Sequence, residues 1–70
     1  MTAPRYMVHA KFPDGSYGNY DCVNGDDLQD MIWFVEFNGG KVTWVGKKYI
    51  LGYINGYQMY EYREMKEVYI

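Results

Sequence analysis

Hydrophobic and polar side chains alternate along residues 5–12 of the chain. Every second side chain of a strand points to the same side, so this pattern predicts a half-buried β-strand. A turn follows over residues 13–15, because Pro13 is suited to start a turn and Gly15 can adopt a positive φ. A second extended segment covers residues 16–23. The apolar positions of the first strand are Tyr6, Val8, Ala10 and Phe12.

The register of this first hairpin follows from keeping its apolar and polar side chains apart. A three-residue loop gives one mostly apolar face, whereas a two-residue loop puts Val8 opposite Asp21. A slip of one residue moves every side chain of a strand to the other face, so the three-residue loop is favoured. The predicted pairs are Phe12–Ser16, Ala10–Gly18, Val8–Tyr20 and Tyr6–Cys22, with Met7, His9 and Lys11 facing Asp21, Asn19 and Tyr17.

A helix of roughly 11 residues is predicted after Asn24-Gly25, and a helix of this length is not stable alone. Asp26 is expected to cap it, with Gln29 completing a capping box, and the residues Asn38-Gly39-Gly40 are expected to end it. The helix must therefore pack on the sheet. Its apolar stripe consists of Leu28, Met31, Ile32 and Val35, and it is widened by Trp33, Phe34 and Phe37 beyond what one sheet face needs.

Three further strands are predicted after the helix. Two of them fall within residues 41–54, separated by a turn at Gly46-Lys47-Lys48. Asn55-Gly56 is a strong hairpin signal and leads into a last strand from Tyr57 to about residue 63. The pairs predicted for a two-residue loop there are Ile54–Tyr57, Tyr53–Gln58, Gly52–Met59, Leu51–Tyr60, Ile50–Glu61 and Tyr49–Tyr62, and a tight turn at Gly46-Lys47 adds Trp44–Tyr49 and Val42–Leu51. The structure of residues 63–70 stays open. The chain is thus expected to form a single domain over residues 1–70, of the α+β class, with a small antiparallel sheet in the order ββαβββ and one short helix on one face.

This second part of the sheet is expected to be apolar on both faces, although one short helix can cover only one of them. The helix is predicted to pack on the more aliphatic face, which holds Thr43, Val45, Ile50, Gly52, Ile54, Tyr57 and Met59. The uncovered face then holds Val42, Trp44, Tyr49, Leu51, Tyr53, Tyr60 and Tyr62. We interpret it as a partner or self-association surface centred on Trp44, Tyr49, Tyr53, Tyr60 and Tyr62. The alternative is that Trp44, Leu51 and Tyr60 form the core beneath the helix.

The aromatic content strengthens this interpretation. Fourteen of the 70 residues are aromatic, nine of them tyrosines, and a domain of this size buries only about 60% of the surface that its unfolded chain exposes. Cys22 is the only cysteine, so no disulfide within the chain stabilises the fold, and oligomerisation is a plausible substitute. The single cysteine, with no signal-like or membrane-spanning apolar run, favours a cytoplasmic setting.

The net charge of −2 is unevenly distributed, with an acidic first half and a basic second half. Acidic residues at the start of the helix suit its positive end, and the acidic residues of the helix are predicted to contact a basic surface on a partner. An ordinary solvated surface is the alternative for these residues. The predicted acidic contacts are Asp26, Asp27, Asp30 and Glu36.

Residues for catalysis or metal binding are sparse. His9 is the only histidine, and the predicted register places it opposite Asn19 and on the other face from Cys22, so no nucleophilic arrangement is expected. Helix capping accounts for the clustered aspartates. We therefore expect no enzyme activity, no cofactor and no metal site.

The function predicted from these features is stoichiometric binding of a protein, with a homodimer expected. In size, layout and lack of catalytic groups the chain resembles the small accessory proteins encoded by bacteriophages, a resemblance of type that covers no motif. Many such proteins bind a host or defence protein and block it, which implies a small inhibitor. Two alternatives remain: an oligomeric sponge for a nucleotide or other small molecule, and a single-stranded nucleic-acid binder. The second rests on basic residues flanking the tyrosines, namely Lys41, Lys47, Lys48 and Arg63.

Overall fold

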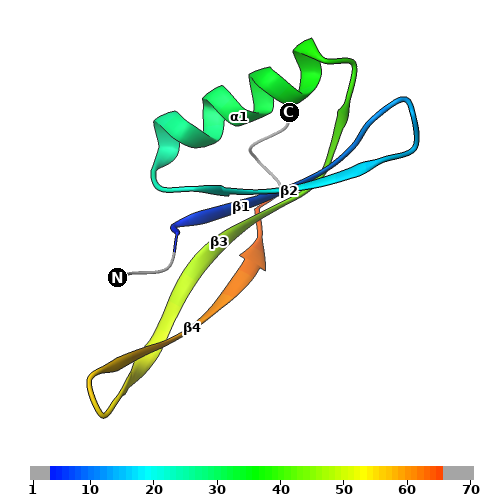
Figure 1. The fold of residues 1–70 in the computed structure, drawn as a ribbon. Helices are drawn as coiled ribbons and strands as arrows, with labels where there is room; N and C mark the ends of the chain where they lie inside the picture. The colour runs from blue at the N-terminus through cyan, green and yellow to red at the C-terminus, as the bar shows by residue number, and fades with distance from the viewer. Residues whose placement is uncertain (1–3, 66–70) are drawn as a thin grey trace.

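The computed structural model describes residues 4–65, which form one antiparallel sheet with a helix on one side (Figure 1). The strands follow the order β2-β1-β3-β4 across the sheet. This arrangement confirms the predicted α+β class. The elements are β1 (Tyr6–Lys11), β2 (Tyr17–Cys22), α1 (Gly25–Phe37), β3 (Lys41–Ile54) and β4 (Tyr57–Glu64).

The first hairpin has the predicted register at every position. Val8 pairs with Tyr20, and Phe12 and Ser16 close the three-residue loop through a bond of 2.9 Å from the Phe12 amide to the Ser16 carbonyl. Gly15 has the positive φ that the turn requires, +90°. Asp14 supports the turn because its Oδ1 accepts hydrogen bonds from the amide and the hydroxyl of Ser16, which lower the pKa of the Asp14 carboxyl.

The helix starts slightly earlier than predicted, and its N-cap is Asn24 rather than Asp26. Asn24 has extended dihedral angles, and its Oδ1 accepts a bond of 2.9 Å from the Asp27 amide. Asp27 reaches back to the Val23 amide at 3.4 Å, so the bonding resembles a capping box that begins at Asn24 instead of Asp26. At the other end the predicted stop is confirmed, with Asn38 as the C-cap and its side chain donating to the Phe34 carbonyl.

The core lies between α1 and the half of the sheet formed by β1, β2 and the first part of β3. It is small, because the helix contributes only two buried side chains to it. Apart from Cys22, its buried side chains are aliphatic. Val42, Met31 and Ile32 are partly buried around it. The buried hydrophobic residues are Val8, Ala10, Cys22, Leu28, Val35 and Val45.

Residues 41–54 form one continuous strand, so the prediction of two strands with a turn at Gly46-Lys47-Lys48 is wrong. The first half of β3 pairs with β1, and from Gly46 onward β3 pairs with β4 on its other edge. A Cβ atom on Gly46 would collide with the indole of Trp44. The glycine is therefore explained by a close approach within a strand, and not by a turn.

The second hairpin has the predicted register only near its tip. Asn55 and Gly56 have φ of 51° and 81°, as a two-residue type I′ turn requires, and Ile54 pairs with Tyr57. The register shifts between Ile50 and Gly52, so that Leu51 is the extra residue of a β-bulge. The pairs predicted beyond this point are wrong: Ile50 lies opposite Tyr60, and neither Leu51–Tyr60, Ile50–Glu61, Tyr49–Tyr62, Trp44–Tyr49 nor Val42–Leu51 forms.

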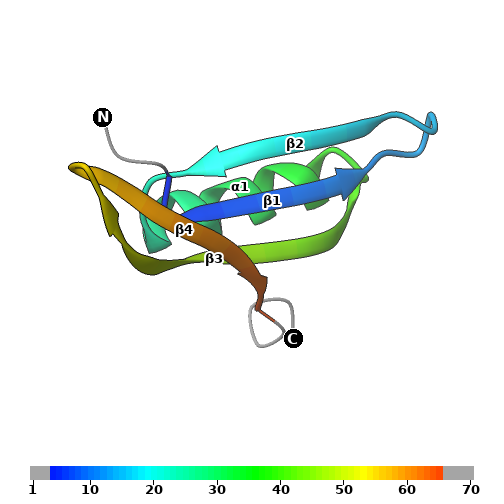
Figure 2. The ribbon, with the colours of Figure 1, turned by 90° about the horizontal axis from the view of Figure 1, so that it is seen from below.

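The β3–β4 hairpin extends well beyond the rest of the sheet and away from α1 (Figures 1 and 2), which gives the molecule principal extents of 44 × 22 × 19 Å. The helix packs on the face that carries Val45, but it does not reach the distal part of the predicted aliphatic face, and Ile50, Ile54, Tyr57 and Met59 are exposed. The alternative prediction, in which Trp44, Leu51 and Tyr60 form the core beneath the helix, is also wrong. Trp44 lies on the opposite face of the sheet, and Leu51 and Tyr60 are exposed.

Candidate interaction surface

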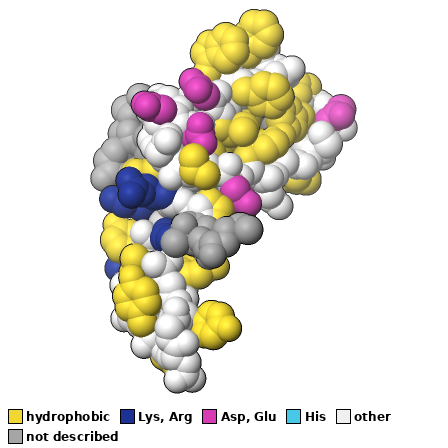
Figure 3. Space-filling view, turned by 60° about the vertical axis from the view of Figure 1, so that its left-hand side comes forward, with side chains coloured by type: hydrophobic (Ala, Val, Ile, Leu, Met, Phe, Trp, Pro, Cys, Tyr) yellow, Lys and Arg dark blue, Asp and Glu magenta, His cyan; other side chains and the backbone are white. Residues whose placement is uncertain are grey.

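The far half of the β3–β4 hairpin exposes eight large apolar side chains, which we call the hairpin surface. Their exposed fractions range from 41% to 77%. They are exposed on both sides of a two-stranded ribbon, because the helix contacts β1, β2 and β3 near its own end of the molecule (Figure 3). The hairpin surface consists of Tyr49, Ile50, Leu51, Tyr53, Ile54, Tyr57, Met59 and Tyr60.

The pairing decides which of the predicted aromatic residues share a face. Residues that lie opposite each other in a ladder point to the same side of the sheet. Tyr62 pairs with Lys48, Tyr60 with Ile50 and Tyr53 with Gln58, and alternation along β3 connects this side to Trp44. Trp44, Tyr53, Tyr60 and Tyr62 therefore lie together on the face that the helix does not cover. Tyr49 lies on the other face, opposite Glu61, because the predicted turn is absent and β3 carries a bulge.

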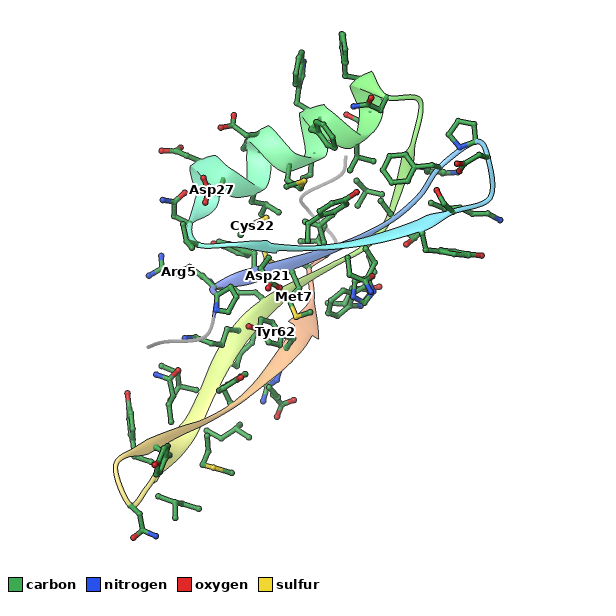
Figure 4. All side chains as sticks on the ribbon, viewed as in Figure 1. Arg5, Met7, Asp21, Cys22, Asp27 and Tyr62 are labelled. Carbon is green, nitrogen blue, oxygen red and sulfur yellow. The ribbon has the colours of Figure 1, made fainter. Side chains whose placement is uncertain are left out.

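The two aromatic residues nearest the body of the sheet are held in place. The Trp44 ring lies 4.8 Å from the His9 imidazole, and the Tyr62 hydroxyl donates a bond of 2.6 Å to the Pro4 carbonyl. Figure 4 shows Tyr62 beneath the sheet near Asp21 and Met7. Partial burial, together with the nearby Tyr60 and Asp21, raises the pKa of the Tyr62 phenol. Trp44 and Tyr62 thus form a fixed base from which the exposed tyrosines project.

The helix carries a second exposed surface, which we call the helix surface. Asp26, Asp30, Trp33 and Phe37 follow each other at intervals of three or four residues and share one exposed side. The rings of Trp33 and Phe37 stack at 4.9 Å, although they are 63% and 73% exposed. Figure 3 shows acidic and hydrophobic side chains side by side at this end of the molecule.

The helix surface was not part of the predicted site, although the sequence held a signal for it. Trp33, Phe34 and Phe37 widened the apolar stripe of the helix beyond what one sheet face needs. Of the predicted acidic contacts, Asp27 is occupied by capping, and Glu36 is exposed one position before Phe37. Asp26 and Asp30 are the two that line up with the aromatic pair.

Basic side chains gather at the base of the hairpin, between the helical body and the hairpin surface (Figure 3). Lys47 and Arg63 lie directly opposite each other, and like charges in such a pair reduce stability. The Arg63 guanidinium lies 4.6 Å from the centre of the Tyr49 ring and 3.3 Å from a Glu61 carboxylate oxygen. Lys48 donates a bond of 2.9 Å to Gln58 on the other face. Three of the four predicted cations, Lys47, Lys48 and Arg63, therefore flank the tyrosines of the hairpin, whereas Lys41 lies opposite Lys11 at the other end of β3.

A nucleophilic arrangement would need His9 close to Ser16 or Cys22, and these residues are not brought together. His9 packs against Trp44 on the uncovered face with the two rings tilted, Cys22 is buried in the core, and the Ser16 hydroxyl donates to Asp14. Among residues 4–65 no group of three His, Cys, Asp or Glu side chains is arranged to hold a metal ion. Within the same range no helix has the length and apolarity needed to cross a membrane.

The buried thiol makes stability depend on alkaline pH. Burial, and secondarily Asp27 and Asp21, raises the pKa of Cys22 above its ordinary value of 9.0. Between these two pKa values the unfolded chain has lost the proton and the folded chain still holds it. The free energy of unfolding should therefore fall as pH rises above 9. Urea titrations at about pH 7 and pH 10 should show a smaller alkaline loss for Cys22→Ala than for the wild type, and equal losses would contradict this origin.

The chain matches no family model, no curated protein and no solved structure. The hairpin surface and the helix surface are therefore the features of the molecule that bear on its function.

Proposed function

We propose that this chain is a non-catalytic protein-binding module that docks onto a target protein through the hairpin surface. One observation carries the proposal: eight large apolar side chains are exposed on a ribbon that the helix does not cover. Large apolar side chains concentrated on one exposed element are expensive to leave in water, and on monomers such a concentration commonly marks a site of interaction. The mode of action that fits such a module is stoichiometric blocking of its target, as in the small phage accessory proteins that the chain resembles in type.

The composition of the surface favours a protein as the partner. Four of its eight residues are tyrosines, whose rings supply large contact areas at low cost in conformational entropy and often dominate binding energies. Tyr53 is 66% exposed near the tip, so it is available as an anchor, while Trp44 and Tyr62 stiffen the base. The helix surface adds the carboxylates of Asp26 and Asp30, which would steer the module toward a basic surface on the target.

A cytoplasmic setting is part of this proposal. Cys22 is a free thiol buried in the core, where it acts as a small hydrophobic residue. A core that contains an unpaired thiol suits a reducing compartment.

The proposal is tested by capture of the target from a lysate of the natural host, followed by titration of the purified target. We expect Tyr53→Ser combined with Ile54→Ser to weaken binding by at least about tenfold, since it removes two exposed anchors. The matched control combines Tyr17→Ser with Val23→Ser, which are similarly exposed, the first on β2 and the second directly after it, at the opposite edge of the sheet from β4. Equal affinity of both double variants would refute docking through the hairpin.

The contribution of the helix is read from the same titration at several salt concentrations. Asp26→Lys with Asp30→Lys should weaken binding and flatten its dependence on salt, because the attraction between exposed charges is screened. An unchanged affinity would remove the helix surface from the proposal while leaving the hairpin in it.

Binding of single-stranded nucleic acid is a second candidate, favoured by the cations beside the tyrosines. Lys47 and Arg63 are adjacent despite their like charge, and an anion between them would relieve the repulsion. Exposed rings beside cations are also the means by which small sheets stack bases. An oligonucleotide titration at low salt tests this candidate, and no binding at high micromolar protein would end it. The small-molecule sponge stays a prediction, because it depends on clefts between subunits.

A further inference from the structure

The outer edge of β4 carries backbone groups that no strand of residues 4–65 pairs. β4 is the last strand of the sheet, with β3 as its neighbour. In a two-residue hairpin the closing pair exchanges both hydrogen bonds, so the backbone of Tyr57 faces β3 and that of Gln58 faces outward. The direction then alternates, and the Met65 amide bonds to the Val45 carbonyl at 2.7 Å, as the alternation requires. The amides and carbonyls of Gln58, Tyr60 and Tyr62 therefore point away from the sheet.

This edge lacks most of the devices that usually prevent strands from pairing between molecules. Proteins protect exposed edges with proline, charged side chains (especially lysine), very short strands or bulges. β4 is eight residues long and contains neither proline nor lysine, and the bulge of the hairpin is on β3. Its charged residues, Glu61, Arg63 and Glu64, all lie in its last four positions, so the half from Tyr57 to Tyr60 carries no charge. Such an edge is a template for another strand.

We propose that the strand it takes is β4 of a second copy, paired antiparallel about a two-fold axis at Tyr60. The two four-stranded sheets then form one eight-stranded sheet across the dimer. Pairing uses the edge and leaves both faces of each hairpin open, so this inference goes beyond the proposed function and stands or falls separately from it. The dimer joins the two uncovered aromatic faces into one.

The position of the axis follows from the alternation of side chains. The two-fold axis is perpendicular to the sheet, so residues that become opposite must lie on the same face, and the axis must pass through a residue rather than between two. An axis at Glu61 sets two carboxylates against each other, and an axis at Tyr62 shortens the pairing within β4. At Tyr60 seven positions pair, from Tyr57 to Arg63, with no like charges opposed.

The Tyr60 register also provides specific contacts. Each Arg63 comes to lie opposite Tyr57 of the second copy, and Glu61 lies opposite Met59. Within one molecule Arg63 already stacks on an aromatic ring, that of Tyr49, at 4.6 Å. The register therefore offers Arg63 a second ring of the same kind.

Disulfide trapping of the whole chain tests the axis, since only a residue on the axis meets its own copy. We would place single cysteines in a Cys22→Ala background and oxidise them mildly. Opposite Cα atoms in a hydrogen-bonded antiparallel pair are about 5.5 Å apart, which suits a disulfide. Tyr60→Cys should form the covalent dimer at least about tenfold faster than Tyr53→Cys, which is more exposed but lies on the inner strand. The cysteines of Gln58→Cys and Tyr62→Cys should crosslink with each other in a mixture.

Two further measurements complete the test, with circular dichroism to confirm that every variant is folded. Light scattering across a concentration series should show a dimer for the wild type and a monomer for Tyr60→Lys, which places like charges at the axis. A monomeric wild type at every concentration, equal trapping at Tyr53, or faster trapping at Glu61→Cys or Tyr62→Cys would overturn the proposal. Trapping is measured without a target, so its failure is distinguishable from a failure of target binding. We expect the double variant Tyr53→Ser with Ile54→Ser to lose target binding, but the same two changes should leave disulfide trapping at Tyr60→Cys unchanged.

Discussion

Replacing Leu28 by alanine should unfold most of the protein at room temperature. Leu28 is 3% exposed and packs in the cluster formed by Val8, Cys22 and Val45. Truncating a buried leucine costs about 2–5 kcal/mol, whereas a core of this size contributes only about 3–5 kcal/mol in total. The helix is too short to be stable without the sheet, so the loss of its main anchor should affect the whole domain. Urea unfolding followed by circular dichroism measures the effect.

Leu51→Ala is the matched control, since it makes the same chemical change at the bulge of the hairpin. Leu51 is 59% exposed and lies outside the buried cluster, so the free energy of unfolding should change by no more than about 0.5 kcal/mol. Similar losses for the two variants would mean that the hairpin contributes to the core as much as the helix does. That outcome would contradict the division of the molecule into a packed body and a projecting ribbon.

The first hairpin shows what local reasoning can predict. Its turn chemistry and its separation of apolar from polar side chains favour the same register, and the structure has that register at all six pairs of β1 and β2. The helix was predicted for the same reason, because stripe, cap and stop signals agree. The N-cap is Asn24 and not the predicted Asp26. Both residue types favour this position, and only the backbone angles decide between them.

The long third strand shows where local reasoning ends. Gly46-Lys47-Lys48 has the composition of a turn, but Gly46 is needed beneath the Trp44 ring, and β3 changes partners from β1 to β4 at this point. The change of partners depends on residues far away in the sequence, and so does the placement of the Trp44 ring, which packs against His9. The bulge at Leu51 then shifts the register by one residue, so that Tyr49 points to the opposite face from Tyr53, Tyr60 and Tyr62. Exposed tyrosines could be predicted from composition, but their grouping could not.

Removing the hairpin tip should separate binding from folding. We would replace residues 50–60 by Asn-Gly, so that Tyr49 and Glu61, which are already paired, close a two-residue turn like that at Asn55-Gly56. None of the six buried hydrophobic residues lies in the removed segment. The free energy of unfolding should therefore change by less than about 1 kcal/mol, as expected for surface changes away from the core.

Target binding by the truncated chain should fall by more than about 100-fold, because seven of the eight side chains of the hairpin surface are lost, and a few anchors carry most of the energy of an interface. Titration of the purified target against both chains measures the loss, with the urea midpoint as the control for folding. A truncated chain that is folded and binds as tightly as the wild type would shift the proposed contact to the helix surface. A chain that fails to fold would show that the ribbon is part of the stable body, and the exposed tyrosines would then need a structural explanation. The expected result, a stable body that no longer binds, would mean that the sequence keeps its apolar ribbon for its partner and not for its fold.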